Sequence, residues 1–207
     1  METDASQFSA NITSECPISP LEMKFMYIEQ LMSLEQDFLS CMHFGIRKYL
    51  KPLQYCILTR YEHTTLFTNI DMLARFSKAN LKSMRDNAAP DDSQTSEDQH
   101  MMLYLPATIQ KQCKAYQLYG KQLEMSNKLL KELNQNKSFR DFVKSQHTTG
   151  EHCRSQPSEQ CPSIQEFINR PALHIQQLYT ALHNILSVTP RDSHDAPLLV
   201  RVTDAIF

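Results

Sequence analysis

The stretch from Ser19 to Leu50, SPLEMKFMYIEQLMSLEQDFLSCMHFGIRKYL, decides the fold class. It opens with Ser19-Pro20-Leu21-Glu22, which combines a serine N-cap, a proline in the first turn and a glutamate at N3. Behind this start, one face carries apolar residues every three or four positions, at Ile28, Leu31, Leu34, Phe38, Met42, Ile46 and Tyr49. This spacing predicts one long amphipathic helix. We expect it to end near Lys51-Pro52, because proline disfavours helical conformation in the residue before it.

Two further parts of the chain predict helices in the same way. Thr59-Arg-Tyr-Glu62 is a second capping box, and apolar residues recur behind it from Leu66 to Met84, which predicts one continuous helix. A third helical block is expected from about Met101 to Leu133. Ser138-Phe-Arg-Asp141 then opens a short helix that extends through Val143.

The C-terminal part predicts two more helices. Ser163-Ile-Gln-Glu166 is another capping box, and the apolar stripe behind it extends to Ile185. Pro171 lies inside this stripe and should kink or interrupt the helix, because proline lacks the amide proton that a helical residue donates. A last segment begins near Asp195-Ala-Pro197 and stops at Phe207 after about three turns. Because isolated amphipathic helices bury little, we expect an elongated all-α bundle.

Polar segments separate the predicted helices. Residues 1–18 lack periodicity and predict a disordered N-terminal tail, so the helical domain is expected to span residues 19–207. Residues 85–99 and 145–162 are rich in polar residues and predict solvated loops. The aromatic residues within the helical stripes, Tyr104, Tyr116, Tyr119 and Phe139, are expected to lie in the core.

Composition excludes several classes of protein. The chain has only three glycines and no G-x-G-x-x-G or G-x-x-x-x-G-K motif, which argues against a phosphate-binding loop. Its net charge of −2 shows no basic surplus for nucleic acid. No apolar stretch approaches the roughly 18 residues of a membrane span. The acidic start Met1-Glu-Thr-Asp-Ala lacks the basic and apolar regions of a signal peptide, so we expect a cytoplasmic protein.

The cysteine and histidine residues follow no pattern that is typical of a metal or catalytic site. The six cysteines form no C-x-x-C motif, and we expect reduced, mostly structural thiols. His147, His152, Cys153 and Cys161 share one polar segment, but their spacing fits no metal-ligand pattern. No Ser/His/Asp or Cys/His arrangement has a recognisable motif around it. We therefore expect no metal, no cofactor and no covalent catalysis.

Three blocks of the chain follow a known family pattern. Residues 27–53 (YIEQLMSLEQDFLSCMHFGIRKYLKPL) follow E-L-x-x-T-E-x-x-Y-V-x-x-L and then Y-L-x-P-L. Residues 66–81 (LFTNIDMLARFSKANL) follow L-F-x-N-I-x-x-I-x-x-x-H-x-x-F-L. Residues 167–182 (FINRPALHIQQLYTAL) follow Y-L-I-K-P-x-Q-R-x-x-x-Y-x-x-L-L, with the polar identities reduced. Over residues 21–207 the chain thus resembles a divergent Dbl-homology domain of the Rho-family guanine-nucleotide exchange factors.

The resemblance implies the architecture and the activity of such a domain. The family fold is an elongated helical bundle that binds a small GTPase of the Rho, Rac or Cdc42 type. It remodels the switch segments and so promotes GDP release without covalent chemistry, by holding the nucleotide-free GTPase more tightly than the loaded one. The chain leaves no room for the pleckstrin-homology domain that normally follows, and its last helix looks cut short.

The resemblance also implies five GTPase-contacting positions, which are Glu29, Gln30, Arg170, His174 and Gln177. Gln30 stands where the family has a glutamate, and a neutral acceptor makes a hydrogen bond about half as strong as an ionised one. Glu29 is adjacent, but it lies about 100° away around the helix and would need a register shift to replace it. Arg170 occupies the position of the family lysine, so that charge is kept.

His174 replaces an arginine of the family and is only partly charged near pH 7. Leu173 stands where the family has a glutamine.

Each assignment has a simpler alternative. Gln30 is also explained as a surface glutamine, Arg170 as a side chain that interacts with a helix end or an acidic loop residue, and His174 as a partly buried or solvent-facing residue. At the level of the whole chain, the alternative to an exchange factor is a degenerate module of the same fold. Such a module binds a GTPase or another helical partner without catalysing exchange. An unrelated helical adaptor is a third possibility.

Overall fold

The computed structural model describes residues 18–88, 109–148, 161–193 and 195–206, and within these ranges the secondary structure is helical. The N-terminal half contains a long first helix, a π-helical turn and three further helices: α1 (Pro20–Gly45), η1 (Ile46–Leu50), α2 (Lys51–Cys56), α3 (Arg60–Phe67) and α4 (Ile70–Ala88). The C-terminal half contains α5 (Ile109–Leu133), α6 (Lys137–Thr148), α7 (Ile164–Ser187) and α8 (Ala196–Ile206). The predicted all-α class is confirmed.

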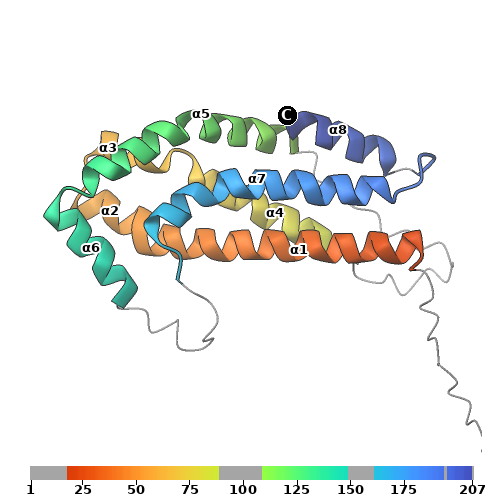
Figure 1. Ribbon diagram of the computed structural model, residues 1–207, viewed down its shortest axis with the longest axis horizontal. Helices are drawn as coiled ribbons and strands as arrows, with labels where there is room; N and C mark the ends of the chain where they lie inside the picture. The colour runs from red at the N-terminus through yellow and green to blue at the C-terminus, as the bar shows by residue number, and fades with distance from the viewer. Residues whose placement is uncertain (1–17, 89–108, 149–160, 194, 207) are drawn as a thin grey trace, which may run out of the picture.

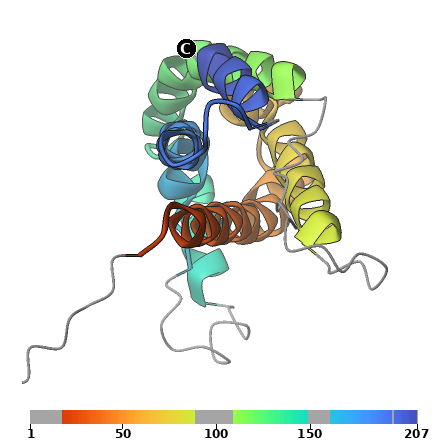
Figure 2. The same ribbon diagram turned by 90° about the vertical axis from the view of Figure 1, so that its right-hand side faces the viewer.

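The helices form an elongated bundle. Helices α1 and α7 lie side by side along the long axis, and α6 projects from the end where α2 and α3 are located (Figure 1). Seen end-on, α1, α4 and α7 and the pair of α5 and α8 surround a common interior (Figure 2). That interior is filled by one apolar cluster with contributions from every long helix, including the fully buried rings of Phe38, Tyr49, Tyr119, Phe139 and Phe167.

Most of the predicted helix starts are confirmed. Ser19, Thr59 and Ser163 each accept a hydrogen bond from the N3 backbone amide, and the N3 glutamate reaches back to the N-cap amide. The exception is α6, where Asn136 rather than Ser138 is the cap, because the Asn136 side chain accepts from the amide of Ser138 at 2.9 Å. Helix α6 therefore begins at Lys137, two residues before the start that a cap at Ser138 implies, and it extends to Thr148.

The interruptions of the helices differ from the predictions at Pro52 and at Thr68. The helical path does not end before Pro52, because η1 widens the preceding turn: the Lys51 amide bonds to the Ile46 carbonyl five residues back. Pro171 lies inside α7, which is not interrupted, and the first turns of that helix are inclined to the rest (Figure 1), in agreement with the predicted kink. The predicted continuous helix from Leu66 to Met84 is instead divided, because Thr68 has a φ of 48°.

The break at Thr68 is compensated by contacts to α5. The Asn69 side chain donates to the Ala115 carbonyl at 3.0 Å, and the Asn69 carbonyl accepts from the amides of Met72 and Leu73 in α4. Ser126 of α5 donates to the Thr65 carbonyl at 2.8 Å. Polar side chains therefore anchor the α3–α4 corner to α5, which sequence periodicity cannot indicate.

The cysteine prediction holds only in part. Cys41, Cys56 and Cys113 are free thiols, whereas Cys161 is in a disulfide bond whose partner lies outside the described residues. This corrects the expectation of reduced thiols throughout. The predicted N-terminal tail, residue Tyr104 and most of the two predicted polar loops also lie outside the described residues. The predicted core positions of Tyr116, Tyr119 and Phe139 are confirmed.

Gly45, the last residue of α1, packs against the ring of Phe167 on α7. A Cβ atom at this position would lie 2.0 Å from Cδ2 of Phe167, whose ring is fully buried. Glycine therefore lets the end of α1 and the start of α7 pack backbone to ring. Gly120 in α5 differs in this respect, because a Cβ atom added there would meet no atom within 4 Å.

We predict opposite effects for the two glycine-to-alanine substitutions. Gly45→Ala should destabilise the protein by about 1–3 kcal/mol, since the added methyl group overpacks the core against Phe167. Gly120→Ala should stabilise it by about 0.5–1 kcal/mol, because alanine is the better helix former and meets nothing. Urea unfolding followed by circular dichroism measures both. Equal effects of the two substitutions would contradict the close packing at Gly45.

Candidate functional site

The candidate site lies along the seam between α1 and α7, which run antiparallel. Near the middle of the seam, the ring of His174 on α7 stacks on Phe38 of α1, with centroids 3.9 Å apart and planes 12° apart. The hydroxyl of Tyr49 donates to the Pro162 carbonyl at 2.9 Å, just before α7 begins. The seam is thus fixed at its middle and at the start of α7.

The five residues predicted from the family resemblance lie at different depths along this seam. Glu29 and Gln30 of α1 are exposed, and Arg170 and Gln177 of α7 are half-buried. Arg170 lies near Cys41, which is eleven residues after Gln30 on α1 and therefore about 16 Å farther along the helix axis. The exposed residues therefore form an extended face rather than a pocket.

Arg170 and Gln177 carry unsatisfied hydrogen-bonding atoms. Arg170 Nε and Gln177 Oε1 are both buried and have no hydrogen-bond partner. The two residues share one side of α7 with Leu173, because the spacing is three and then four residues. Leu173 is 46% exposed. This side of α7 therefore combines a cation, an amide oxygen and an apolar side chain.

The positive charge of Arg170 affects the pKa values of neighbouring side chains. Burial raises the pKa of Cys41 to about 11, and the positive charge of Arg170 opposes this rise. The same charge acts on His174, whose pKa burial lowers to about 3. At neutral pH the seam thus contains a neutral thiol and a neutral imidazole beside one guanidinium.

His174 does not belong to the exposed face, and this corrects the sequence prediction. Its side chain has no exposed surface, and it contacts Phe38 on one side and Tyr116 of α5 on another. The family resemblance placed a recognition residue at this position. In this chain the position is part of the core, and a side chain buried in this way is not available to a partner.

Beneath the face lies a polar cluster that sequence reasoning missed as a site. Glu35 of α1 is 1% exposed and accepts hydrogen bonds from Ser77 and Asn80 of α4. Asn80 also donates to Gln112 of α5 at 2.9 Å. Burial raises the pKa of Glu35 to about 7, and the hydrogen bond from Ser77 partly opposes that rise. The available sequence signal was the interruption of an apolar stripe by Ser77.

The far end of the seam is joined to α8 by a buried ion pair. Lys24 Nζ lies 2.7 Å from Asp195 Oδ2, and both side chains are less than a tenth exposed. Asp195 directly precedes α8, and its carbonyl accepts from the amide of Leu199. This pair therefore fixes the start of α8 against the first turns of α1.

We predict that Asp195→Ala destabilises the protein by about 3–5 kcal/mol, because the ammonium group of Lys24 stays buried without its counter-ion. Adding Lys24→Met should recover most of this loss. Asp141→Ala is the control: it breaks the exposed Lys137–Asp141 pair and should leave stability nearly unchanged. Urea unfolding of the four proteins measures these effects. A double variant no more stable than Asp195→Ala would contradict the buried-pair explanation.

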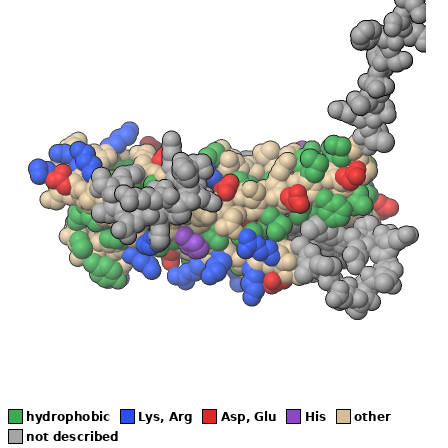
Figure 3. Space-filling view, turned by 90° about the horizontal axis from the view of Figure 1, so that it is seen from below, with side chains coloured by type: hydrophobic (Ala, Val, Ile, Leu, Met, Phe, Trp, Pro, Cys, Tyr) green, Lys and Arg blue, Asp and Glu red, His purple; other side chains and the backbone are tan. Residues whose placement is uncertain are grey.

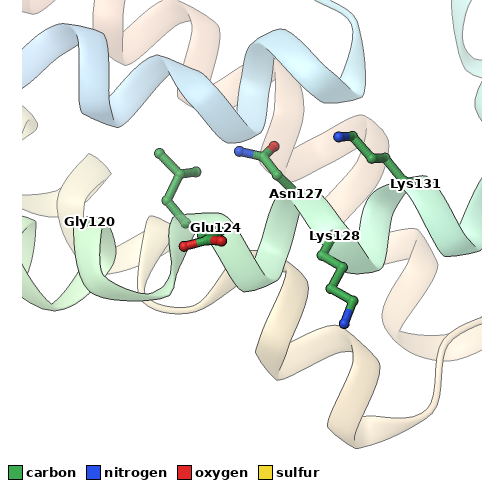
Figure 4. Close-up of a pocket in the computed structure, with 6 residues that line it drawn as sticks. Gly120, Glu124, Asn127, Lys128 and Lys131 are labelled. Atoms are coloured by element: carbon green, nitrogen blue, oxygen red, sulfur yellow. The ribbon is translucent and has the colours of Figure 1, made fainter.

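Two other surface features lie away from the seam. A depression is lined by residues of α5 alone, which are Gly120, Leu123, Glu124, Asn127, Lys128 and Lys131. Lys128 points away from Lys131 there, so the polar groups do not converge on a ligand (Figure 4). On α4, exposed basic residues recur every three or four positions, at Arg75, Lys78, Lys82 and Arg85. Figure 3 shows Lys and Arg side chains along the lower edge, where α4 lies.

Neither feature has the chemistry of a metal or cofactor site. In the part of the chain that the structure describes, no three His, Cys, Asp or Glu side chains are grouped to hold a metal ion. His152 and Cys153, whose spacing fits no metal-ligand pattern, lie outside the described residues. None of the helices described here is long and apolar enough to cross a membrane.

The fold and its α1–α7 face define the class of this protein as an elongated helical bundle of the Dbl-homology type. Residues 27–206 match the RhoGEF domain family. The chain therefore belongs to the RhoGEF domain family. No curated protein matches the chain.

Solved structures show the same fold. The linker–DH/PH structure of p115-RhoGEF is 13% identical, with a TM-score of 0.71, and the match covers 90% of this chain and 55% of that one. A structure of the Vav1 exchange factor is 17% identical, with a TM-score of 0.68 and coverage of 91% and 47%. The DH/PH domains of PDZ-RhoGEF, solved with GTP-gamma-S-activated RhoA, are 12% identical, with a TM-score of 0.66 and coverage of 90% and 51%. The chain spans about half the length of these proteins.

Proposed function

We propose that this protein binds a Rho-family small GTPase through the α1–α7 face and promotes GDP release by remodelling the switch segments. Membership of the RhoGEF domain family supports the class of partner. The observation that carries the proposed face is the side of α7 on which Arg170, Leu173 and Gln177 lie. A partner there would meet an exposed leucine and the half-buried side chains of Arg170 and Gln177.

The proposed contacts follow from the charges on this face. Arg170 supplies a guanidinium group, which binds a carboxylate of the partner with two parallel hydrogen bonds. Gln30 is exposed on α1, about 16 Å along the helix axis from Cys41, which lies near Arg170. Together with the neighbouring Glu29, it supplies the hydrogen-bond acceptor for the other switch segment. An extended face of this length suits a folded protein rather than a small ligand. A Rho-family partner also places the proposed activity in the cytoplasm.

A second function is favoured by two specific observations. Gln30 is neutral where the family pattern has a glutamate, and His174 is buried where the pattern has a charged recognition residue. Both differences weaken binding to the nucleotide-free state, on which exchange depends. A protein with these differences would bind a GTPase, or another helical partner, without catalysing exchange.

Release of a fluorescent GDP analogue from purified Rho, Rac and Cdc42 separates the two functions, when combined with a binding measurement by calorimetry. Accelerated release from one of them is the result expected for an exchange factor. Binding without acceleration supports the non-catalytic module. Neither binding nor release with any of the three, with a protein that circular dichroism shows to be helical, would contradict both the exchange factor and the GTPase-binding module.

We predict that Arg170→Glu weakens GTPase binding by about 10- to 100-fold, because it replaces a charge-assisted hydrogen bond with repulsion. Lys78→Glu is the matched control, since it makes the same change of charge at an exposed position of α4. It should bind as the unaltered protein does. Thermal unfolding confirms that both variants are folded. Equal binding by the two variants would show that the face is wrongly assigned.

We predict that Gln30→Glu increases the rate of GDP release, or creates it if the unaltered protein has none, because an ionised acceptor makes the stronger hydrogen bond. Gln36→Glu is the control on the same helix, where the side chain faces α4 and accepts from Arg85. This control should leave the rate unchanged. No gain from Gln30→Glu in a protein that still binds the GTPase would exclude the missing carboxylate as the reason for weak exchange.

A further inference from the structure

The strongest feature outside the proposed contact face is the buried pair of Glu35 and His174. Glu35 is 1% exposed and His174 is 0% exposed, and they meet where α1, α4, α5 and α7 pack together. Two ionisable side chains buried in one site are costly unless each has a partner. The arrangement of hydrogen bonds around them shows how this cost is avoided.

Both oxygens of Glu35 accept hydrogen bonds from α4. Ser77 donates to Oε2, and the amide nitrogen of Asn80 donates to Oε1 at 3.3 Å. Oε2 also faces the imidazole Nε2 of His174 at 3.6 Å. The Nε2 atom has no other hydrogen-bond partner. The one contact between Glu35 and His174 is therefore between Oε2 and Nε2.

The opposite nitrogen of His174 has its own partner. Nδ1 lies 2.6 Å from the hydroxyl of Tyr116 on α5, and the ring is held flat against Phe38 of α1. A half-turn of the ring would keep the stacking on Phe38, but it would move Nδ1 away from Tyr116 and Nε2 away from Glu35. Its two nitrogens stay directed at Glu35 and at Tyr116, and only the positions of the protons are free to change.

Oε2 and Nε2 are 3.6 Å apart, and a proton between them makes this contact favourable. Without one, lone pairs of an oxygen and a nitrogen would face each other in a site buried from solvent. We infer that Glu35 and His174 form an internal proton-binding site, in which loss of one proton reverses the tautomer of His174 and the hydroxyl direction of Tyr116. The ligand of this site is the proton, and the inference does not depend on the proposed function.

The two states of the site balance as follows. In the protonated state, the carboxylic acid of Glu35 donates to Nε2, and Nδ1–H donates to the Tyr116 oxygen. In the deprotonated state, Nε2–H donates to the carboxylate, and Nδ1 accepts from the Tyr116 hydroxyl. The imidazole is neutral in both, and the states differ by one proton. No step needs an imidazolium ion in the core.

The electrostatics of the neighbouring groups favour this neutral imidazole. Burial raises the pKa of Glu35 to about 7 and lowers the pKa of His174 to about 3, so the shared proton stays on the pair across mildly acidic pH. Arg170 of α7 lowers the pKa of His174 further. Helix α5 presents Tyr116 and Cys113, whose pKa values are both raised by burial, and α4 presents Ser77 and Asn80.

Nitrogen-15 NMR of the histidine side chains in the full chain tests the inference directly, because the shifts of Nδ1 and Nε2 distinguish the two tautomers and the imidazolium. We expect His174 to change from the Nδ1–H to the Nε2–H tautomer with a midpoint near pH 7 and to show no imidazolium at pH 6. The signal is assigned by its loss in His174→Phe, or by through-bond correlations if that variant does not fold. An imidazolium at pH 6, or the same tautomer at pH 6 and pH 8.5, would overturn the inference.

A pair of glutamate variants provides an independent test. In Glu35→Gln the tautomer should no longer depend on pH, whereas Glu29→Gln, at an exposed position of the same helix, should behave as the unaltered protein. The folded protein holds the Glu35 proton more tightly than the unfolded chain does. The stability that this proton gives is therefore present below about pH 4.5 and is lost as pH rises toward 7.

Across this interval, the unfolding constant of the unaltered protein should rise relative to that of Glu35→Gln by about tenfold per pH unit. Urea unfolding at several pH values between 4.5 and 7 measures this ratio, with Glu29→Gln as the reference. A ratio that does not change with pH would overturn the inference even if the NMR signal of His174 is not resolved.

Discussion

The packing of α7 against α1 is the constraint on which the rest of this structure depends. Three contacts of different kinds fix it. Gly45 leaves space for the Phe167 ring, and His174 stacks on Phe38. The Tyr49 hydroxyl donates a hydrogen bond to the backbone that precedes α7. Because the three contacts lie at different positions along the helix axes, they allow only one register of α7 against α1. The bundle is then completed by α4 and α5, whose polar side chains meet the same seam.

This constraint also explains why the exposed and buried residues of the seam differ from the family pattern. One turn of α7 contributes Leu173 to the surface and His174 to the core. A polar residue at the first position and a cation at the second would suit recognition of a GTPase, as the resemblance implies. Here the cation is replaced by an imidazole that burial keeps neutral. Arg170 and Gln177, which lie one turn away on either side, are half-buried rather than fully buried.

The fold could be predicted from the sequence where local interactions decide it. The capping boxes at Ser19, Thr59 and Ser163 involve residues three positions apart, so they are visible in the sequence. The break at Thr68 could not be predicted, because its compensation comes from hydrogen bonds to α5, which lies more than forty residues away in the chain. Continuation of the helix through Pro52 depends on a wider turn that local propensity does not favour.

The candidate site was predictable to a smaller extent. The family resemblance indicated the positions of Gln30, Arg170 and Gln177, but it did not indicate how deeply each side chain is buried. The burial of His174 is set by Phe38, Tyr116 and Glu35, which come from two other helices. The apolar stripe did predict that Tyr116 lies in the core. It could not show that its hydroxyl would meet an imidazole there, because that contact joins residues 58 positions apart.

The π-helical turn from Ile46 to Leu50 has a consequence for comparing this chain with its relatives. A turn whose hydrogen bond spans five residues holds one residue more than an α-helical turn, so it acts as an insertion within a continuous helix. Positions before the turn and positions after it therefore differ in phase by about 100° around the axis. An alignment anchored at Glu35 keeps Gln30 in register. An alignment that is anchored at Tyr49 and counts back with α-helical spacing would instead place the contact position on the neighbouring face of α1.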